Sequence, residues 1–202
     1  VLHQDVAGIA GAVELNDKFG EQMAVGDFNN DGLDDLAVGA ISEDVGDLFN
    51  AGTVTVLYGH PGGLAANTAS SDTIDENDFS GLLQEESDEF GGGLAAGDFN
   101  RDGFDDLAIG VAGEDLVNGG VNVGSVIVAS GSAAGIVLGT RTVVNLDSSG
   151  RSRSGDRYGA TLASGDFNND NVDDLAVGIP NRKDGSATIK GAVHLVFSTA
   201  DT

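Results

Sequence analysis

Cysteine and tryptophan are absent from the chain, and proline occurs only twice in its 202 residues. Without cysteine the protein has neither a disulfide framework nor a thiol nucleophile. No apolar run approaches the ~20 residues that are needed to span a bilayer. The N-terminus also lacks a basic segment followed by an apolar one, so we expect a mature, soluble chain that does not insert into membranes.

Basic residues are scarce, since 9 lysines and arginines stand against 33 aspartates and glutamates and the net charge is −24. The imbalance is concentrated in residues 1–140, which hold 25 acidic and 2 basic residues, whereas residues 141–202 hold 8 and 7. Such a chain repels polyanions. We therefore expect no nucleic acid partner and no anionic membrane surface, and cations are the natural counterpart.

Glycine is abundant, with 32 residues, and the apolar runs are short and rich in valine, leucine, isoleucine and alanine. This composition is typical of many short strands joined by tight turns, and long amphipathic helices are not evident. The sequence therefore predicts an all-β fold.

A segment of 14 residues occurs three times, at 26–39, 97–110 and 165–178. The first copy matches the second at 11 positions and the third at 12. Each copy follows an aromatic-glycine pair, namely Phe19-Gly20, Phe90-Gly91 and Tyr158-Gly159. Similarity this close between segments about 70 residues apart identifies a repeat array.

Each repeat predicts four strands. In the first repeat, residues 22–26 and 35–40 flank a polar loop as a hairpin, 52–58 form a third strand and the surroundings of 73–74 a weaker fourth. The corresponding third strands are expected at 124–129 and 191–197, and the fourth strand after the second repeat at 141–146.

A four-stranded unit of this size cannot bury both of its faces alone, so neighbouring units must stack, as they do in a β-propeller. We expect a single propeller segment over 1–202, with repeat units at about 1–65, 66–135 and 136–202. Residues 1–6 are expected to supply an outer strand by exchange. Three blades fall short of the ~4 to 8 that close a ring, so we expect a half-ring completed by a second copy, as half of a six-bladed propeller, or by another segment of a longer chain.

The repeated loop predicts a calcium site. Asp27, Asn29, Asp31 and Asp35 occupy positions 1, 3, 5 and 9 of the loop, and position 7 offers its main-chain carbonyl. Calcium takes about six to eight oxygens at ~2.3 to 2.6 Å, so the loop must curl. Glycine at position 6 allows the left-handed backbone that curling requires. Asn171 stands there in the third loop, and asparagine also tolerates a positive φ, so we expect a left-handed Asn171 and a retained site.

Other kinds of site fit the loop less well. An EF-hand needs a glutamate at position 12 and flanking helices, but position 12 is Val38, Ile109 or Val177 and the flanks have strand character. Magnesium prefers a smaller shell with several waters, and zinc prefers cysteine or histidine. Solvated acidic turns are the remaining alternative, although they do not explain why the 1, 3, 5, 9 pattern recurs in all three copies.

The aromatic-glycine pair, Gly-Asp-Phe-Asn-x-Asp and Asp-Asp-Leu-Ala-(Val or Ile)-Gly together resemble the FG-GAP repeat of integrin alpha-subunit propellers and bacterial surface proteins. The chain departs from the Gly-Ala-Pro ending of that motif at residues 39–41, 110–112 and 178–180. The resemblance implies one calcium ion per repeat, the carbonyl being the ligand at position 7. The implied ligands are Asp27, Asn29, Asp31, Leu33 and Asp35; Asp98, Asn100, Asp102, Phe104 and Asp106; and Asp166, Asn168, Asp170, Val172 and Asp174.

We expect a calcium-binding module of the cell surface or extracellular space that serves adhesion, recognition or scaffolding, with structural calcium. His3, His60 and His194 are isolated and no nucleophile elbow occurs, so no catalytic residue is predicted. The alternatives are a propeller-based hydrolase acting on polysaccharide or lipid, and a structural protein that self-assembles by strand exchange. The variable loops 42–50, 113–121 and 181–188 are candidates for contacting a protein or glycan ligand, or are ordinary tolerant loops.

Overall fold

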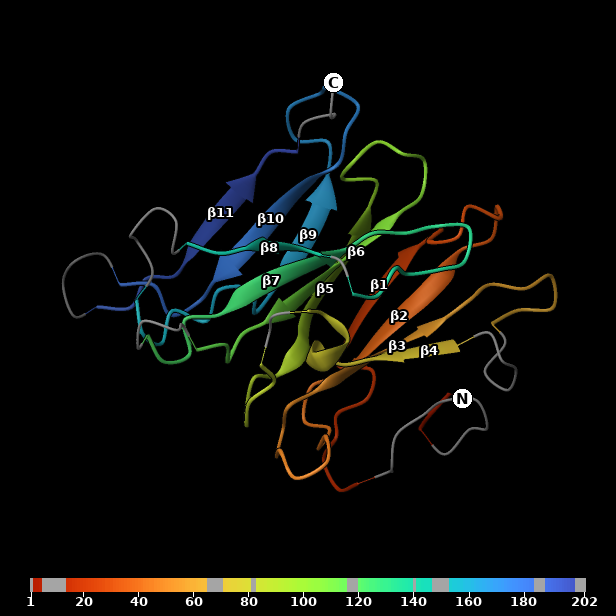
Figure 1. Cartoon of the computed structure of the whole chain (residues 1–202). Coiled ribbons are helices and arrows are strands. Elements are labelled where there is room, and N and C mark those ends of the chain that lie inside the picture. The colour runs from red at the N-terminus through yellow and green to blue at the C-terminus, as the bar shows by residue number, and fades with distance from the viewer. Residues whose placement is uncertain are drawn as a thin grey trace.

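The computed structural model describes residues 2–4, 14–64, 71–80, 83–115, 120–139, 141–146, 153–183 and 188–198. These residues form three antiparallel sheets, one for each repeat (Figure 1). The first sheet contains β1 (Gln22–Gly26), β2 (Asp35–Ala40), β3 (Thr53–Leu57) and β4 (Ser71–Ile74), and a single 3-10 turn, η1 (Glu76–Asp78), follows it. The second contains β5 (Phe90–Gly97), β6 (Asp106–Val111), β7 (Ser125–Ala129) and β8 (Thr142–Val144); the third contains β9 (Leu162–Gly165), β10 (Asp174–Ile179) and β11 (Ala192–Val196).

Within each sheet the strands follow one another as an antiparallel meander, and the expected hairpins are confirmed. In the first repeat β1 and β2 have the bounds that the sequence predicts, with Gly26 paired to Asp35 and Gln22 to Gly39. The third strands of the first and third repeats are one residue shorter at each end than expected, and that of the second repeat begins one residue later. Among the described residues η1 is the only helical segment, and none of them forms a helix long and apolar enough to cross a membrane.

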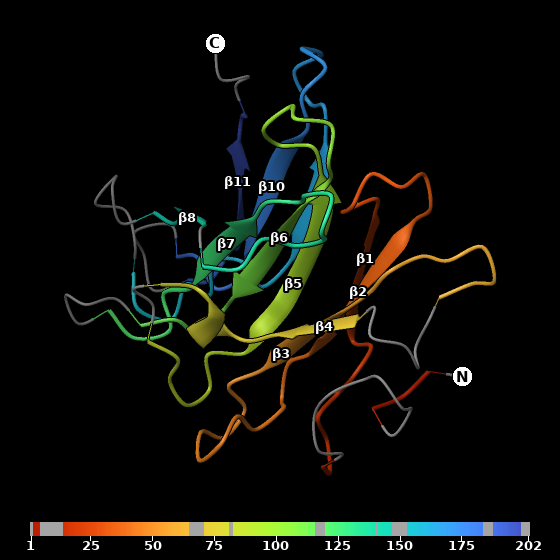
Figure 2. The same ribbon diagram turned by 45° about the vertical axis from the view of Figure 1, so that its right-hand side comes forward.

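The three sheets stand side by side as propeller blades, and they do not close into a ring (Figures 1 and 2). The first strand of each blade lies innermost, and β5 contacts both β1 and β9. The predicted β-propeller architecture is therefore confirmed as a partial ring. Of the outer strand expected at residues 1–6, Leu2, His3 and Gln4 are described and none lies in a strand, while the other three lie outside the described residues.

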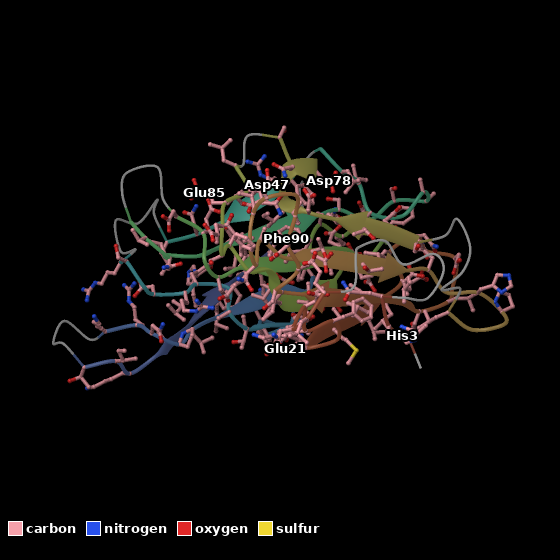
Figure 3. The ribbon with its side chains drawn as sticks, turned by 90° about the horizontal axis from the view of Figure 1, so that it is seen from below. His3, Glu21, Asp47, Asp78, Glu85 and Phe90 are labelled. Atoms are coloured by element: carbon pink, nitrogen blue, oxygen red, sulfur yellow. The ribbon has the colours of Figure 1, made fainter. Side chains whose placement is uncertain are left out.

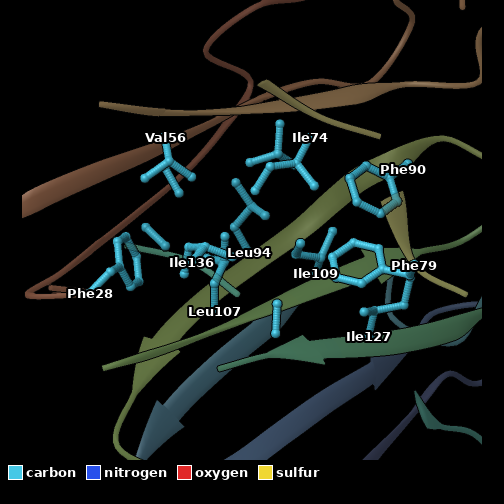
Figure 4. Packing of buried hydrophobic residues seen from close by; sticks show 14 of the residues in the cluster. Phe28, Val56, Ile74, Phe79, Phe90, Leu94, Leu107, Ile109, Ile127 and Ile136 are labelled. Carbon is cyan, nitrogen blue, oxygen red and sulfur yellow. The ribbon is translucent and has the colours of Figure 1, made fainter. Parts of the chain in front are cut away.

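The main hydrophobic core lies between the first and second blades (Figure 4). Its largest members, fully buried, include Phe28, Phe79 and Phe90, and the rings of Phe79 and Phe90 have centroids 6.4 Å apart. A second cluster around Tyr158 and Leu175 fills the space between the second and third blades. The aromatic residue of the aromatic-glycine pair thus recurs because it fills the space between one blade and its predecessor.

The two outer blade faces are apolar and exposed. Strand register makes Val54, Val126 and Val193 equivalent, because they pair with the glycine at the same position of their blades, Gly39, Gly110 and Gly178 respectively. Val54 and Val126 are 0 % exposed between blades, whereas Val193 is 68 % exposed. At the other end Met23 is 60 % exposed, while its equivalent Leu94 is 6 % exposed. Each end of the row therefore presents the surface that elsewhere packs against another blade.

Candidate metal sites in the hairpin loops

The three candidate sites lie in the connections β1–β2, β5–β6 and β9–β10, which emerge together at the upper edge of the blades in Figure 1. This arrangement follows from the meander, because the first turn of each blade lies at the same end of its sheet. The connections β2–β3, β6–β7 and β10–β11 leave from the opposite end.

The aspartate at position 1 organises each loop. In the first loop the Oδ1 atom of Asp27 accepts the N–H of Asp31 at 3.0 Å, and its Oδ2 atom accepts the N–H of Gly32 at 2.9 Å. Asp98 and Asp166 accept the same pair of N–H groups in their loops at 2.9 to 3.1 Å. These bonds curl the backbone around one carboxylate. Although desolvation opposes it, the N–H groups of the loop lower the pKa of Asp166.

Positions 3 and 5 point inward as well. The Oδ1 atom of the position-3 asparagine accepts the position-5 N–H at 2.8 to 2.9 Å, and the position-5 carboxylate accepts the position-7 N–H at 2.9 Å, in all three loops. In the second loop the Nδ2 atom of Asn100 lies 2.9 Å from Asp102 Oδ2 and 3.4 Å from Asp106 Oδ1. The positive end of an amide dipole thus lies between two carboxylates, a place that suits positive charge.

The backbone at position 6 is left-handed in every loop, with φ values of 84° at Gly32, 90° at Gly103 and 65° at Asn171. The expected left-handed Asn171 is confirmed. Position 4, which the sequence interpretation passed over, is also left-handed, with φ of 52° at Asn30, 62° at Arg101 and 63° at Asn169. The left-handed backbone at position 4 could have been predicted from the asparagine that occupies two of these three positions.

The position-9 aspartates Asp35, Asp106 and Asp174 are buried at the base of the loops. Asp35 accepts the N–H of Phe28 at 3.0 Å and that of Gly59 at 2.7 Å, so it joins the hairpin to the end of the third strand. The other two make the same link to the residues after β7 and β11. Burial raises the pKa of Asp35, and it raises that of Asp106 to about 6. A carboxylate has about four lone-pair sites, so these bonds leave capacity for a metal ion.

Position 8 links one blade to the next, a role that the sequence interpretation missed. The Oδ2 atom of Asp105 accepts the N–H of Asp27 in the preceding loop at 2.8 Å, and Asp173 accepts the N–H of Asp98 at 3.2 Å. Gly26 is required at this approach, because a Cβ there would lie 2.9 Å from the Asp105 carboxylate. The only indication of this role in the sequence was that aspartate recurs at position 8 in all three copies.

The donors fit a hard cation such as calcium, because each loop has carboxylate and amide oxygens and those at positions 1, 3 and 5 bond to the same curled backbone. The carboxylates at positions 1, 5 and 9 nevertheless remain apart. Among the described residues, the only group of three acidic side chains with ligand oxygens all within 4.8 Å of one another is Glu76, Asp88 and Glu114, which lies elsewhere. A bound ion would have to draw the loop carboxylates closer together.

The sequence profile of the FG-GAP repeat matches residues 19–57, 90–128 and 158–196, which contain the three loops. Phosphatidylinositol-glycan-specific phospholipase D from Bos taurus is 32 % identical over 189 residues, covering 90 % of this chain and 21 % of that protein. The Homo sapiens protein of the same name is 33 % identical over 187 residues, with the same coverages of 90 % and 21 %. Integrin alpha pat-2 from Caenorhabditis elegans is 28 % identical over 198 residues, covering 92 % of this chain and 14 % of that protein. The chain thus spans about a fifth or less of the length of these relatives.

Proposed function

The chain belongs to the FG-GAP repeat family, and from this premise we propose that it is a calcium-binding, extracellular or cell-surface propeller module for adhesion, recognition or surface scaffolding. The observation that supports the proposal best is the hydrogen-bond network repeated in all three loops, in which oxygen-bearing side chains converge around a curled backbone. The relatives named integrin alpha pat-2 support the proposal that the chain belongs to this class of surface module.

Calcium in this proposal is structural. Three divalent ions would change the formal charge from −24 to −18 and would relieve repulsion that is concentrated in the loops. An ion that binds only the folded state at ~1000 times its dissociation constant stabilises that state by about 4 kcal/mol. The proposed ligands are the fifteen residues named above for positions 1, 3, 5, 7 and 9.

Thermal unfolding in calcium and in excess chelator tests this role. We expect chelator to lower the melting temperature, and Asp98→Asn to reduce the calcium-dependent increase because it removes a charge from the residue that organises the second loop. The control is Asp47→Asn, which removes one charge from an exposed residue of the β2–β3 connection. A melting temperature that does not respond to chelator would contradict structural calcium.

A further blade is the proposed partner of the two exposed end faces, supplied by a second copy or by another part of a longer chain. Residues equivalent to the exposed Met23 and Val193 are buried between blades, which supports this proposal. Two copies would make a six-bladed ring, and open-ended association would make filaments visible by electron microscopy. A protein or glycan ligand is proposed for the connections at the other end of the blades.

The phospholipase D relatives favour a second candidate, in which the module belongs to a hydrolase acting on lipid or polysaccharide. Only about a fifth of those proteins aligns with this chain, so we expect the chain alone to lack hydrolytic activity and to serve as a platform. Hydrolysis of a glycosylphosphatidylinositol substrate by the purified chain would show instead that catalysis resides in these repeats.

A further inference from the structure

Three acidic side chains meet at the contact between the first and second blades. Glu76 belongs to η1, Asp88 lies two residues before β5, and Glu114 follows β6. One carboxylate oxygen from each lies within 4.8 Å of the other two. The group is distant in sequence from the hairpin loops and lies where the β6–β7 connection begins. Figure 3 looks at the molecule from that side, with the neighbouring residues Asp78 and Glu85 labelled.

Two of the three side chains are buried, Glu114 is half-buried, and no described residue supplies a positive charge to the cluster. Glu76 is 0 % exposed and Asp88 is 1 % exposed. Among the described residues no basic or amide group donates a hydrogen bond to Glu76, and Asp88 accepts the N–H of Glu85. None of the ion pairs between described residues involves the three acids. A buried carboxylate without a donor is costly, so this arrangement requires a positive ligand or bound protons.

In the first and third repeats, other side chains of the protein pair with residues that are equivalent to members of this cluster. The aspartate two residues before the aromatic recurs as Asp17 and Asp156. In the first repeat the Nε2 atom of Gln4 donates to Glu43, the counterpart of Glu114, at 2.6 Å. In the third repeat Arg182 stands at the counterpart position and forms an ion pair with Asp156. In the second repeat, by contrast, all three side chains that meet are acidic.

Burial opposes ionisation of this group. Desolvation raises the pKa of Glu76 to about 10, and the charges of Glu114 and Asp88 add to this effect. Desolvation is also the largest cause that raises the pKa of Asp88 and the pKa of Glu114. Three carboxylates that cannot ionise together without compensation must bind either protons or a cation.

We propose that Glu76, Asp88 and Glu114 bind a divalent cation of the calcium type, at a site separate from the hairpin loops. The ligands are all carboxylate oxygens, which suit hard cations, and no histidine or cysteine belongs to the group. Oxygens that share one calcium ion at ~2.3 to 2.6 Å lie up to about 5 Å apart, which agrees with their spacing here. The ion would hold η1, which follows the first sheet, against the beginning of β5 and the end of β6.

Glu76→Gln tests the site because the amide is isosteric with the carboxylate and reproduces the pairing of Gln4 with Glu43. Equilibrium dialysis at a fixed free calcium concentration, followed by elemental analysis, counts the bound ions. We expect the variant to bind one ion fewer per chain than the unaltered protein, and Glu86→Gln, an exposed residue of the same segment, to bind as many. Equal counts for the unaltered protein and Glu76→Gln would overturn the proposal, as would the same loss in Glu86→Gln.

A second measurement keeps the proposal testable if Glu76→Gln does not fold. Crystals of the unaltered protein grown with manganese should show an anomalous scattering peak between the three carboxylates, and its absence would overturn the site. Peaks in the hairpin loops are a separate result that bears on the function proposed above. In chelator we expect Glu76→Gln to melt at a higher temperature than the unaltered protein, since the buried glutamate must take up a proton on folding near neutral pH and glutamine need not.

Discussion

Asn171 occupies a backbone conformation that the other two loops give to glycine. Its φ of 65° is close to that of its neighbour Asn169, at 63°, so the third loop contains two left-handed asparagines. Left-handed backbone is unfavourable for most L-residues and least so for asparagine and aspartate. The third loop therefore retains its hydrogen-bond network at a modest conformational cost.

Replacing Asn171 by glycine should tighten calcium binding at the third loop, because glycine adopts the left-handed region freely. We expect a gain below about 1 kcal/mol, or up to ~5-fold in affinity. The reciprocal substitution Gly32→Asn should lower the calcium affinity of the first loop by a similar factor. No atom lies within 4 Å of an added Cβ there, so only the conformational energy of the backbone changes. Calorimetric titration of both variants measures the two effects. Unchanged affinity in Asn171→Gly would mean that the position carries no strain.

At the scale of the elements, the blades are connected by more than apolar packing. Asp105 accepts an N–H from the loop of the blade before it, and Arg157 pairs with Glu89 across the second and third blades. Polar links at both ends of the blades thus orient the apolar faces.

Asp105→Ala should destabilise the contact between the first two blades, because the N–H of Asp27 loses its acceptor. A hydrogen bond to a charged group contributes about 1.5 to 3 kcal/mol, and partial access to water reduces this to about 1 to 2 kcal/mol. For a chain of this size we expect the melting temperature to fall by about 2 to 8 °C. Asp34→Ala is the matched control, since Asp34 holds position 8 of the first loop and is exposed. Equal losses in both variants would show that the link between blades contributes nothing.

At the scale of the whole molecule, charge and apolar surface are distributed along the row of blades. The acidic excess lies in residues 1–140, while residues 141–202 are nearly neutral. The last blade exposes Phe167, Val193, Leu195 and Phe197, and the first exposes Met23 and Val25. The two faces differ, so their association would run head to tail and would bring the acidic first blade against the nearly neutral third.

Val193→Glu should reduce self-association, because it places a charge in the centre of a face that would be buried against another blade. We expect the mass measured by light scattering to shift toward the 20.3 kDa of a single chain. Leu15→Glu is the control, since Leu15 is also exposed to solvent but lies outside the strands. A compact monomer for the unaltered protein at all concentrations would contradict association between copies and favour completion by a longer chain.

The sequence alone determined the three repeats, the bounds of the first hairpin and the left-handed Asn171, because each depends on residues within one short segment. Hydrogen bonds between neighbours along the chain, and the tolerance of glycine and asparagine for positive φ, act locally and leave a repeated pattern. The FG-GAP resemblance is confirmed. The calcium ligands stay a prediction, because a loop of the right composition does not by itself bring its carboxylates around an ion.

Tertiary structure decided what the stacking of blades brings together. The bond from Asp27 to Asp105 joins residues 78 apart in sequence, and Glu76, Asp88 and Glu114 come from three separate segments of the chain. Val54 and Val193 hold equivalent positions in their sheets, yet one is buried and the other exposed because only one has a blade beside it. Burial, desolvation and contact between distant segments depend on how the blades stack. A repeated sequence specifies the fold of each blade, but it specifies less clearly which blade packs beside it.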